Sequence, residues 1–147
     1  MSKNERQEND DLGENVKEFE WPHGRPIYVI QKHQARNLHY DLRLEMEGVL
    51  RSWAVPKEPP TQPGVKRLAV QVDDHELDYA TFEDEIPEGE YGAGTVEIWD
   101  RGSYEVIEKD EKKFVLEING EKLKGKYVLL HFAKGGEKNW LFFKMKD

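Results

Sequence analysis

Polar and apolar residues alternate strictly in the stretch His39-Tyr40-Asp41-Leu42-Arg43-Leu44-Glu45-Met46. Side chains of a β-strand point alternately to opposite faces, so this pattern predicts a strand with one polar and one apolar face. The apolar face is suited to a protein core. The polar face presents His39, Asp41, Arg43 and Glu45 in a row, with about 7 Å between successive side chains.

Short segments rich in β-branched and aromatic residues recur on both sides of this strand, separated by turn residues. The predicted strands are Ile27–Gln31, His39–Met46, Val49–Val55, Leu68–Val72, Thr95–Trp99, Tyr104–Glu108, Lys113–Ile118, Tyr127–Phe132 and Trp140–Met145. We therefore expect a mainly β fold, a meandering antiparallel barrel or sandwich with few short helices.

The joints between these strands carry their own signals. Tight reversals are expected at Glu47-Gly48, Asn119-Gly120 and Gly135-Gly136. Loops are expected in the proline-rich segment 56–64 and the glycine-rich segment 87–94, because proline supplies no donor for strand pairing. One or two helical turns around Tyr79–Glu85 are the best helical candidate.

Composition narrows the domain organisation and the compartment. A chain of 147 residues fits one domain, and the absence of cysteine excludes disulfides and thiolate metal ligands. No apolar run approaches the ~20 residues of a membrane span, and the N-terminus lacks the pattern of a secretion signal, which predicts a cytoplasmic protein with no membrane contact. We expect residues 1–20 to form a disordered or loosely attached acidic tail and residues 21–147 to form the barrel domain.

The net charge of −8 argues against binding long duplex nucleic acid through a broad basic face. Local chemistry is still available on the polar row. An imidazole nitrogen of His39 and a carboxylate oxygen of Asp41 can bind one metal ion, and His33 could reach the same ion across the segment 34–38. Arg43 cannot be a ligand, but its guanidinium suits phosphate oxygens. The alternative is that this row is only the solvated face of a strand.

A second polar cluster follows the predicted strand Leu68–Val72. In it, His75 could contact a phosphate or donate a proton, and Tyr79 could donate its hydroxyl to a phosphoryl oxygen. From the residues alone, an acidic surface turn is the better interpretation. Lys57 and Arg67 bracket the proline-rich loop and could supply local positive charge, although isolated surface cations are the commoner explanation.

Several multi-residue motifs resemble the 3′-phosphoesterase domain of ligase D in that family's order. The resemblance covers about Ile27 to Lys146 and rests on the segments 31–33, 38–45, 52–57, 66–70, 74–80, 86–89, 91–96 and 99–102. The sequence departs from the family's pattern at Asp73, where Glu is usual, at Glu58, where Gly is frequent, and at Glu76, where Pro is expected.

The resemblance implies a compact β-barrel enzyme of DNA break repair that acts at the 3′ end of a DNA or RNA primer-template. Such enzymes remove a 3′-terminal ribonucleoside and then the 3′-phosphate, leaving a 3′-hydroxyl, with manganese as the usual metal. By position, the family's metal ligands correspond to His33, His39 and Asp41. Its phosphate-engaging residues correspond to Arg43, His75 and Tyr79, and its supporting positions to Gln31, Lys57, Arg67 and Asp73. The family's role also implies a separately encoded DNA ligase and polymerase.

Two other functions fit parts of the pattern. An iron oxygenase with two histidines and one carboxylate also places His-x-Asp on a barrel strand, with a distant histidine such as His131 as the third ligand. A non-catalytic repair module could cap strand ends through Arg43, Lys57 and Arg67.

Overall fold

The computed structural model describes residues 25–90, 93–132 and 135–146. The predicted tail at residues 1–20 lies outside these ranges, as do positions 91–92 of the predicted glycine-rich loop. In the described part of the chain, no helix has the length and apolar character that a membrane span requires.

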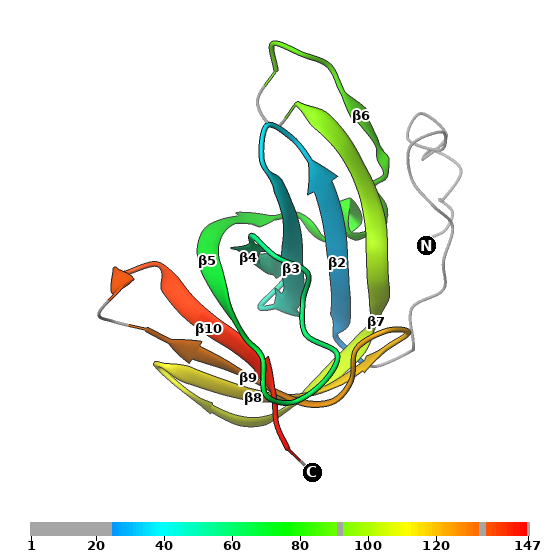
Figure 1. Cartoon of the computed structure of the whole chain (residues 1–147). Coiled ribbons are helices and arrows are strands. Elements are labelled where there is room, and N and C mark those ends of the chain that lie inside the picture. The colour runs from blue at the N-terminus through cyan, green and yellow to red at the C-terminus, as the bar shows by residue number, and fades with distance from the viewer. Residues whose placement is uncertain (1–24, 91–92, 133–134, 147) are drawn as a thin grey trace, which may run out of the picture.

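Nine strands and one short 3₁₀ helix, η2 (Leu77–Thr81), make up the described fold (Figure 1). The strands are β2 (Ile27–Gln34), β3 (Leu38–Met46), β4 (Val49–Val55), β5 (Lys66–His75), β6 (Asp84–Ile86), β7 (Gly94–Asp110), β8 (Lys113–Gly120), β9 (Lys124–His131) and β10 (Asn139–Lys144). They pair in the order β2-β3-β4-β5-β10-β9-β8-β7, and a β7–β2 pairing closes the ring, with β6 added to β7. All of these pairings are antiparallel. The prediction of a mainly β, antiparallel barrel is confirmed.

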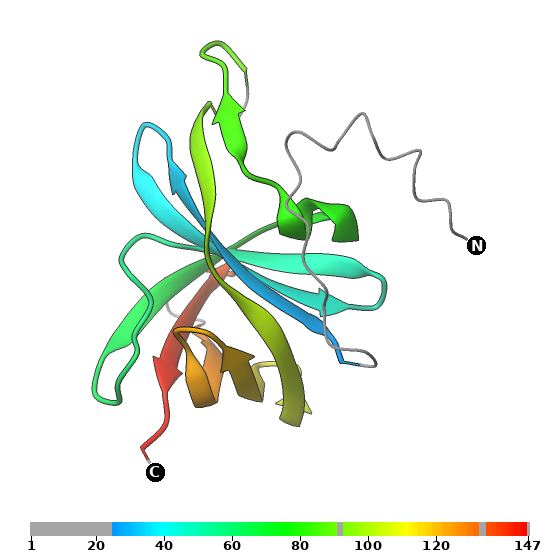
Figure 2. The ribbon, with the colours of Figure 1, turned by 90° about the vertical axis from the view of Figure 1, so that its right-hand side faces the viewer.

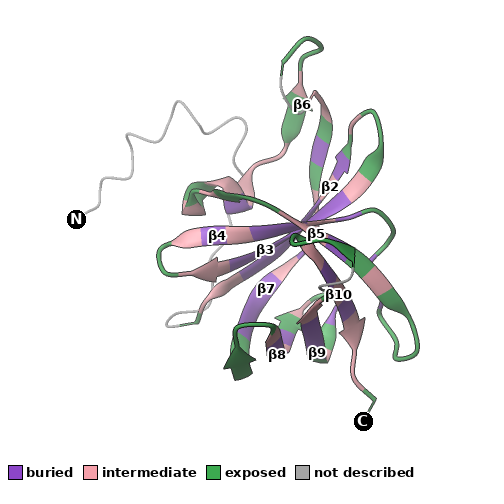
Figure 3. Cartoon of the chain, turned by 90° about the vertical axis from the view of Figure 1, so that its left-hand side faces the viewer, coloured by how far each residue is buried: buried purple, intermediate pink, exposed green. Residues whose placement is uncertain are grey.

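The interior of the barrel is a single apolar cluster to which all eight strands of the ring contribute. Its largest members, fully or almost fully buried, are Trp53, Tyr28, Tyr104, Tyr127, Phe142, Leu42 and Leu44. Figure 3 shows buried segments along the strands of the ring, while the connecting loops are mostly exposed. Burial of this aromatic-rich set supplies the main driving force for folding.

A second, smaller cluster lies on the opposite face of β2 and β4. It contains Val29, Leu50 and Ala80, with Leu77 and Tyr79 packed against them. The last three of these residues belong to η2, which Figures 2 and 3 show lying beside the β3–β4 hairpin. The helix therefore covers the face of the sheet that the alternation in β3 makes polar.

The middle of the polar row of β3 is consequently buried, while His39 and Glu45 at its ends are partly exposed. Asp41 is 7% exposed and Arg43 is 4% exposed, although both point away from the barrel core. At Asp41 and Arg43, the interpretation of this row as an ordinary wet strand face is wrong, because both are buried and Tyr79 of η2 lies over Arg43.

Other differences concern element boundaries. Two strands were predicted at residues 95–99 and 104–108, but β7 is continuous over 17 residues. At Gly102, β7 passes close to β8. A Cβ at this position would collide with the carbonyl oxygen of Asn119. The helix predicted around Tyr79–Glu85 is the short turn Leu77–Thr81. The strand β6 was not expected, and β8 continues through Gly120, where a reversal was predicted.

Asp100 fastens the β8–β9 turn to the barrel wall. Its carboxylate accepts hydrogen bonds from the backbone N–H groups of Glu121, Lys122 and Leu123, at 2.8 to 2.9 Å, and from the hydroxyl of Tyr28 at 2.8 Å. Burial, together with the charge of Asp100, raises the pKa of Tyr28 well above its ordinary value, so the hydroxyl remains a donor. Asp100 is 1% exposed, and its four donors make this buried charge tolerable.

Replacing Asp100 by Ala should lower the free energy of unfolding by about 3–5 kcal/mol, because several buried donors lose their acceptor at once. Urea denaturation measures this loss. The control is Asp110→Ala, which removes a single exposed bond to the N–H of Lys112 and should cost less than about 1 kcal/mol. Similar losses in the two variants would contradict the role assigned to Asp100.

Candidate functional site

Two histidines and one aspartate meet where β2 and β3 approach their shared turn. His33 and His39 are directly opposite each other in the β2–β3 register, with ring centroids 4.8 Å apart. Asp41 Oδ2 lies 3.5 Å from His39 Nε2 and 3.9 Å from His33 Nδ1. One potential ligand atom from each residue lies within 4.8 Å of the other two, and His33 and Asp41 are buried. The predicted set of metal ligands is therefore brought together by the strand pairing alone.

The ring of His39 is oriented by the turn that precedes it. Its Nδ1 lies 3.0 Å from the carbonyl oxygen of Asn37. A carbonyl oxygen can only accept, so Nδ1 carries the proton of this hydrogen bond and Nε2 faces Asp41. In a neutral His39, the lone pair of Nε2 would therefore point at the carboxylate oxygen of Asp41. Such an arrangement requires positive charge between the two atoms, either a proton on Nε2 or a metal ion. The donor set suits Mn²⁺, Fe²⁺ or Zn²⁺.

The pKa shifts of His39 and Asp41 also indicate that positive charge is stabilised between these two side chains. The hydrogen bond with Asp41 raises the pKa of His39 above its ordinary value, against the opposing effect of burial. Burial alone would raise the pKa of Asp41, but the hydrogen bond from His39 and the charge of Arg43 outweigh it, so that pKa is lowered. Asp41 is therefore an anion at neutral pH, available to a proton donor or a cation.

Arg43 is held on three sides by residues of three strands. Its Nε donates to Gln31 Oε1 at 2.6 Å, Nη1 donates to Ser52 Oγ at 2.8 Å, and Nη2 donates to Asp41 Oδ2 at 3.3 Å. Burial lowers the pKa of Arg43, with Asp41 opposing that effect, and a guanidinium stays protonated in proteins. Of its five N–H groups, three are engaged, which leaves one on each terminal nitrogen for an anion.

Gln31 joins this arginine to the covering segment. While its Oε1 accepts from Arg43, its Nε2 donates to the backbone carbonyls of Tyr79 at 2.8 Å and Phe82 at 3.1 Å. The guanidinium carbon of Arg43 lies 5.0 Å from the centroid of the Tyr79 ring, within cation–π range. Gln31 therefore fixes the distance between Arg43 and η2.

Tyr79 and His75 form one stacked group above Arg43. The ring of His75 stacks on Tyr79 with centroids 4.5 Å apart, and Phe82 stacks on Tyr79 at 4.9 Å. Burial and then the charge of Arg43 lower the pKa of His75, and burial raises the pKa of Tyr79 against the opposing charge of Arg43. At neutral pH both side chains are uncharged and can donate hydrogen bonds. The acidic residues Asp73, Asp74, Glu76 and Asp78 of this segment are exposed, as in a surface turn, but His75 and Tyr79 are partly buried against each other and Arg43.

Comparison with known proteins identifies the family of the chain. The family described as the DNA ligase D 3′-phosphoesterase domain matches residues 31–131. The multifunctional non-homologous end joining proteins LigD of Pseudomonas aeruginosa and Mycolicibacterium smegmatis are 52% and 47% identical over 128 and 131 residues. The corresponding DNA repair protein of Mycobacterium tuberculosis is 45% identical over 129 residues. In each comparison, 82% of this chain is covered, but only 15%, 17% and 16% of the relative.

The chain belongs to the DNA ligase D 3′-phosphoesterase domain family.

The match to the phosphoesterase domain starts at Gln31 and so includes every residue of the site described above. The matched region ends at His131, the histidine that the iron-oxygenase alternative needs as its third metal ligand. His131 lies on β9, where its ring packs against Trp140 and its Nε2 contacts the carbonyl oxygen of Glu137 at 2.8 Å. Among the described residues, the group that could hold a metal ion consists of His33, His39 and Asp41 and does not include His131.

The remaining predicted supporting residues of the phosphoesterase domain lie around this centre rather than in it. Asp73 is exposed on β5, two residues before His75, and Lys57 is exposed in the loop after β4. Arg67 is partly buried on β5, and its Nε donates to the carbonyl of Glu58 at 2.8 Å. Gln31 is hydrogen-bonded to Arg43 within the site, and the charge of Asp73 acts on His75.

The principal residue that the sequence did not single out is Ser52. It is fully buried, receives the Nη1 bond of Arg43 and donates to the carbonyl of Leu50 at 3.1 Å. The signal was available in the two-residue turn Glu47-Gly48, because such a turn sets the register of a hairpin. In that register, Ser52 stands directly opposite Arg43 and on the same face.

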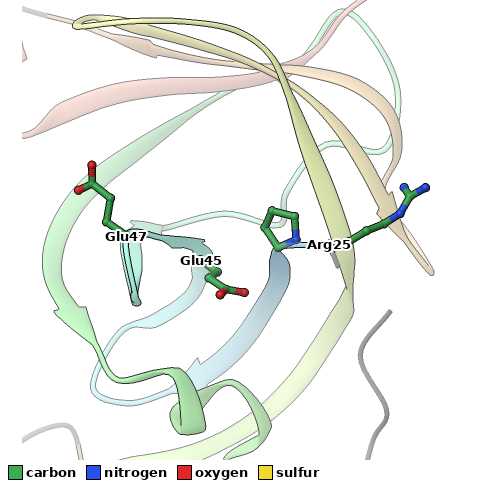
Figure 4. Close-up of a pocket in the computed structure, with 4 residues that line it drawn as sticks. Arg25, Glu45 and Glu47 are labelled. Atoms are coloured by element: carbon green, nitrogen blue, oxygen red, sulfur yellow. The ribbon is translucent and has the colours of Figure 1, made fainter. Parts of the chain in front are cut away.

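A shallow cleft of about 450 Å³ lies at the other end of the β2–β3 hairpin. It is lined by Arg25, Pro26, Glu45 and Glu47 (Figure 4). Two of its three charged groups already have partners, since Arg25 pairs with Glu105 at 2.7 Å and Glu45 accepts the N–H of Ile27 at 2.9 Å. Asp41 stands four residues before Glu45 on β3, roughly 13 Å away, so this cleft is separate from the site.

Replacing Ser52 by Ala should lower the free energy of unfolding by about 1–3 kcal/mol, because a buried N–H of a charged group is left without its acceptor. Chemical denaturation would detect the loss. Ser103→Ala makes the same change at another buried serine, on β7, outside the site. A loss no larger than that of Ser103→Ala would show that the Arg43–Ser52 bond is not needed to hold the buried arginine.

Proposed function

We propose that this protein is a metal-dependent phosphoesterase that processes the 3′ end of a nucleic-acid strand during the repair of DNA breaks. The observation that carries the proposal is one continuous buried network. In it, a cluster of two imidazoles and a carboxylate shares Asp41 with a phosphate-binding guanidinium, Arg43, beneath the stacked rings of His75 and Tyr79.

The metal would be held by His33, His39 and Asp41, and manganese is the ion we propose. The residues fit a metal ion in two respects. Their donor types are suitable, and His39 Nε2 faces Asp41 Oδ2, two atoms that require positive charge between them. A divalent ion in such a site supplies Lewis-acid stabilisation of the phosphoryl group and lowers the pKa of a coordinated water.

Arg43 is suited to bind and orient the phosphoryl group. Its guanidinium is fixed by Gln31, Ser52 and Asp41, so the two remaining N–H groups keep their direction when an anion arrives. Donors that are already oriented stabilise developing negative charge without reorganisation. Because the arginine is buried, this interaction is also less screened than it would be in water.

His75 and Tyr79 are suited to act on the oxygen that leaves the phosphorus. The lowered pKa of His75 keeps the free protein's imidazole neutral, and an arriving phosphate anion would raise it and favour the protonated form. A protonated His75 can donate its proton to the leaving oxygen, while the Tyr79 hydroxyl donates a hydrogen bond to a phosphoryl oxygen. The stack with Phe82 limits the rotation of both rings.

The substrate we propose is the 3′ end of a primer-template that carries a terminal ribonucleotide or a 3′-phosphate. The first step would release the ribonucleoside and leave a 3′-phosphate, and the second would convert that phosphate to a 3′-hydroxyl. The similar LigD proteins are described as multifunctional in non-homologous end joining, and this chain spans about a sixth of their length. From the family's role in break repair, we also propose that a DNA ligase and a polymerase act on the processed end, in the cytoplasm.

The direct test is to incubate the full chain with a labelled primer-template that ends in one ribonucleotide, with manganese or with chelator, and to resolve the products. The expected result is a shortened strand with a 3′-phosphate and then a 3′-hydroxyl, only when metal is present. Tight binding of the strand end with no product in manganese would favour the non-catalytic capping module instead.

Alanine at His39 or Asp41 should abolish both reactions and weaken Mn²⁺ binding by more than the roughly 10–100-fold that loss of an outer partner causes. Titration calorimetry and the primer assay measure the two effects. His131→Ala, a histidine change on β9, should leave both unchanged. Near-normal turnover in either His39→Ala or Asp41→Ala would contradict the assignment of these residues as metal ligands.

Loss of the leaving-group machinery should affect turnover but not metal binding. We expect His75→Ala to lower kcat by at least about 100-fold, as for loss of a general acid, and Tyr79→Phe to lower it by about tenfold or more. Mn²⁺ affinity should stay at the parent value, because neither residue is a ligand. Asp78→Ala, an exposed neighbour in η2, is the matched control. Loss of metal binding in His75→Ala would contradict these roles.

A further inference from the structure

We propose that Arg36, at the tip of the β2–β3 turn, binds a backbone phosphate of the strand whose 3′ end is processed. This inference rests on the proposed function, and it adds a contact outside the reacting group. Residues 35–37 form the turn between the strands that carry His33 and His39, so Arg36 stands three residues from each of them. No other exposed cation in the described chain lies as close in sequence to two of the candidate ligands.

The turn projects beyond the neighbouring strand on one side. The β3–β4 pairing begins at Tyr40 and Val55, so Leu38 and His39 extend past the end of β4. Residues 36–38 are all exposed. A long basic side chain at this tip is therefore accessible to a strand that reaches the cluster of His33, His39 and Asp41.

On its other side, the turn is braced. Gly94, with a φ of 129°, lies where a Cβ would collide with the carbonyl oxygen of Gln34 and crowd the Cα of Ala35. The start of β7 thus packs directly against the base of the turn, and the Asn37 carbonyl is bound to His39 Nδ1. Arg36 is a cation on a supported turn whose next residue orients a candidate ligand.

The surrounding charges indicate where the strand would run. The segment from β6 to the start of β7 is acidic and exposed, with Asp84, Glu85, Glu88 and Glu90. In the register, Asp84 pairs with Val96, which pairs with His33, so this acidic flank begins two strands from the site. It repels a polyanion and leaves the β3–β4 side, where Lys57 is exposed, as the path of approach.

Arg36 itself is available for a phosphate. Within the described residues, it has no ion pair with any carboxylate, whereas Arg25 at the opposite end of β2 is paired with Glu105. In a chain with a net charge of −8, each such local cation accounts for a large share of the attraction to a strand.

The test compares Arg36→Ala and Arg36→Lys with Arg25→Ala, which removes the same charge far from the site. Binding of a fluorescent primer-template is measured in chelator over a range of salt concentrations, and turnover is measured in manganese on the primer-template and on a nucleoside 3′-monophosphate. We expect Arg36→Ala to weaken primer binding roughly threefold to tenfold at low salt and to reduce the salt slope by about 1.

KM for the primer-template should rise by a similar factor, while kinetics on the nucleoside 3′-monophosphate should stay at the parent values. Arg36→Lys should keep most of the affinity, and Arg25→Ala should match the parent. An unchanged salt slope in Arg36→Ala, or an equal loss on both substrates, would overturn the inference. The binding arm needs no turnover, so failure of the proposed reaction in the parent protein would be distinguished from failure of the Arg36 contact.

Discussion

The structure depends on the burial of one guanidinium on the outer face of a barrel. Three N–H groups of Arg43 find acceptors, and these come from Gln31 on β2, Asp41 on β3 and Ser52 on β4. A buried charge that loses its partner costs several kcal/mol, so the three strands must be in correct register before this face can close. Gln31 also binds the backbone of the covering segment. The same hydrogen bonds therefore connect three strands of the barrel to the covering segment and hold the candidate site together.

Asp41 connects the two halves of that site. A single oxygen, Oδ2, lies within 4 Å of His33, His39 and Arg43. The carboxylate therefore cannot change its charge or position without affecting both the histidine cluster and the guanidinium. In the proposed reaction, this coupling holds a phosphoryl group between a metal and an arginine at a fixed separation. It also explains why the site needs burial: in water, the same charges would be screened and would not hold one another in place.

Sequence alone predicted the parts of the site that follow from strand periodicity. The alternation in residues 39–46 placed Asp41 and Arg43 on one face. Ser52, which the short turn after Met46 sets opposite Arg43, was not predicted. What periodicity cannot predict is that η2, more than thirty residues later, covers this face, because Gln31 holds it through backbone carbonyls that leave no trace in the sequence. For the same reason, His75 and Tyr79 looked like surface residues until their resemblance to a family was considered. The continuity of β7 was missed because Gly102 permits a close approach of strands, although it looks like a break.

The acidity of the chain is consistent with an activity at strand ends rather than along a duplex. Proteins that bind duplex through many phosphates gain affinity from counterion release, and a chain with a net charge of −8 has little of that to gain. At a strand end, by contrast, one phosphoryl group can enter a buried site where a single oriented arginine has a large effect. Weak attraction to the rest of the strand also allows the processed end to leave. In the proposed function, the acidic flank on β6 would repel the polyanion on that side and so restrict the direction from which an end can enter.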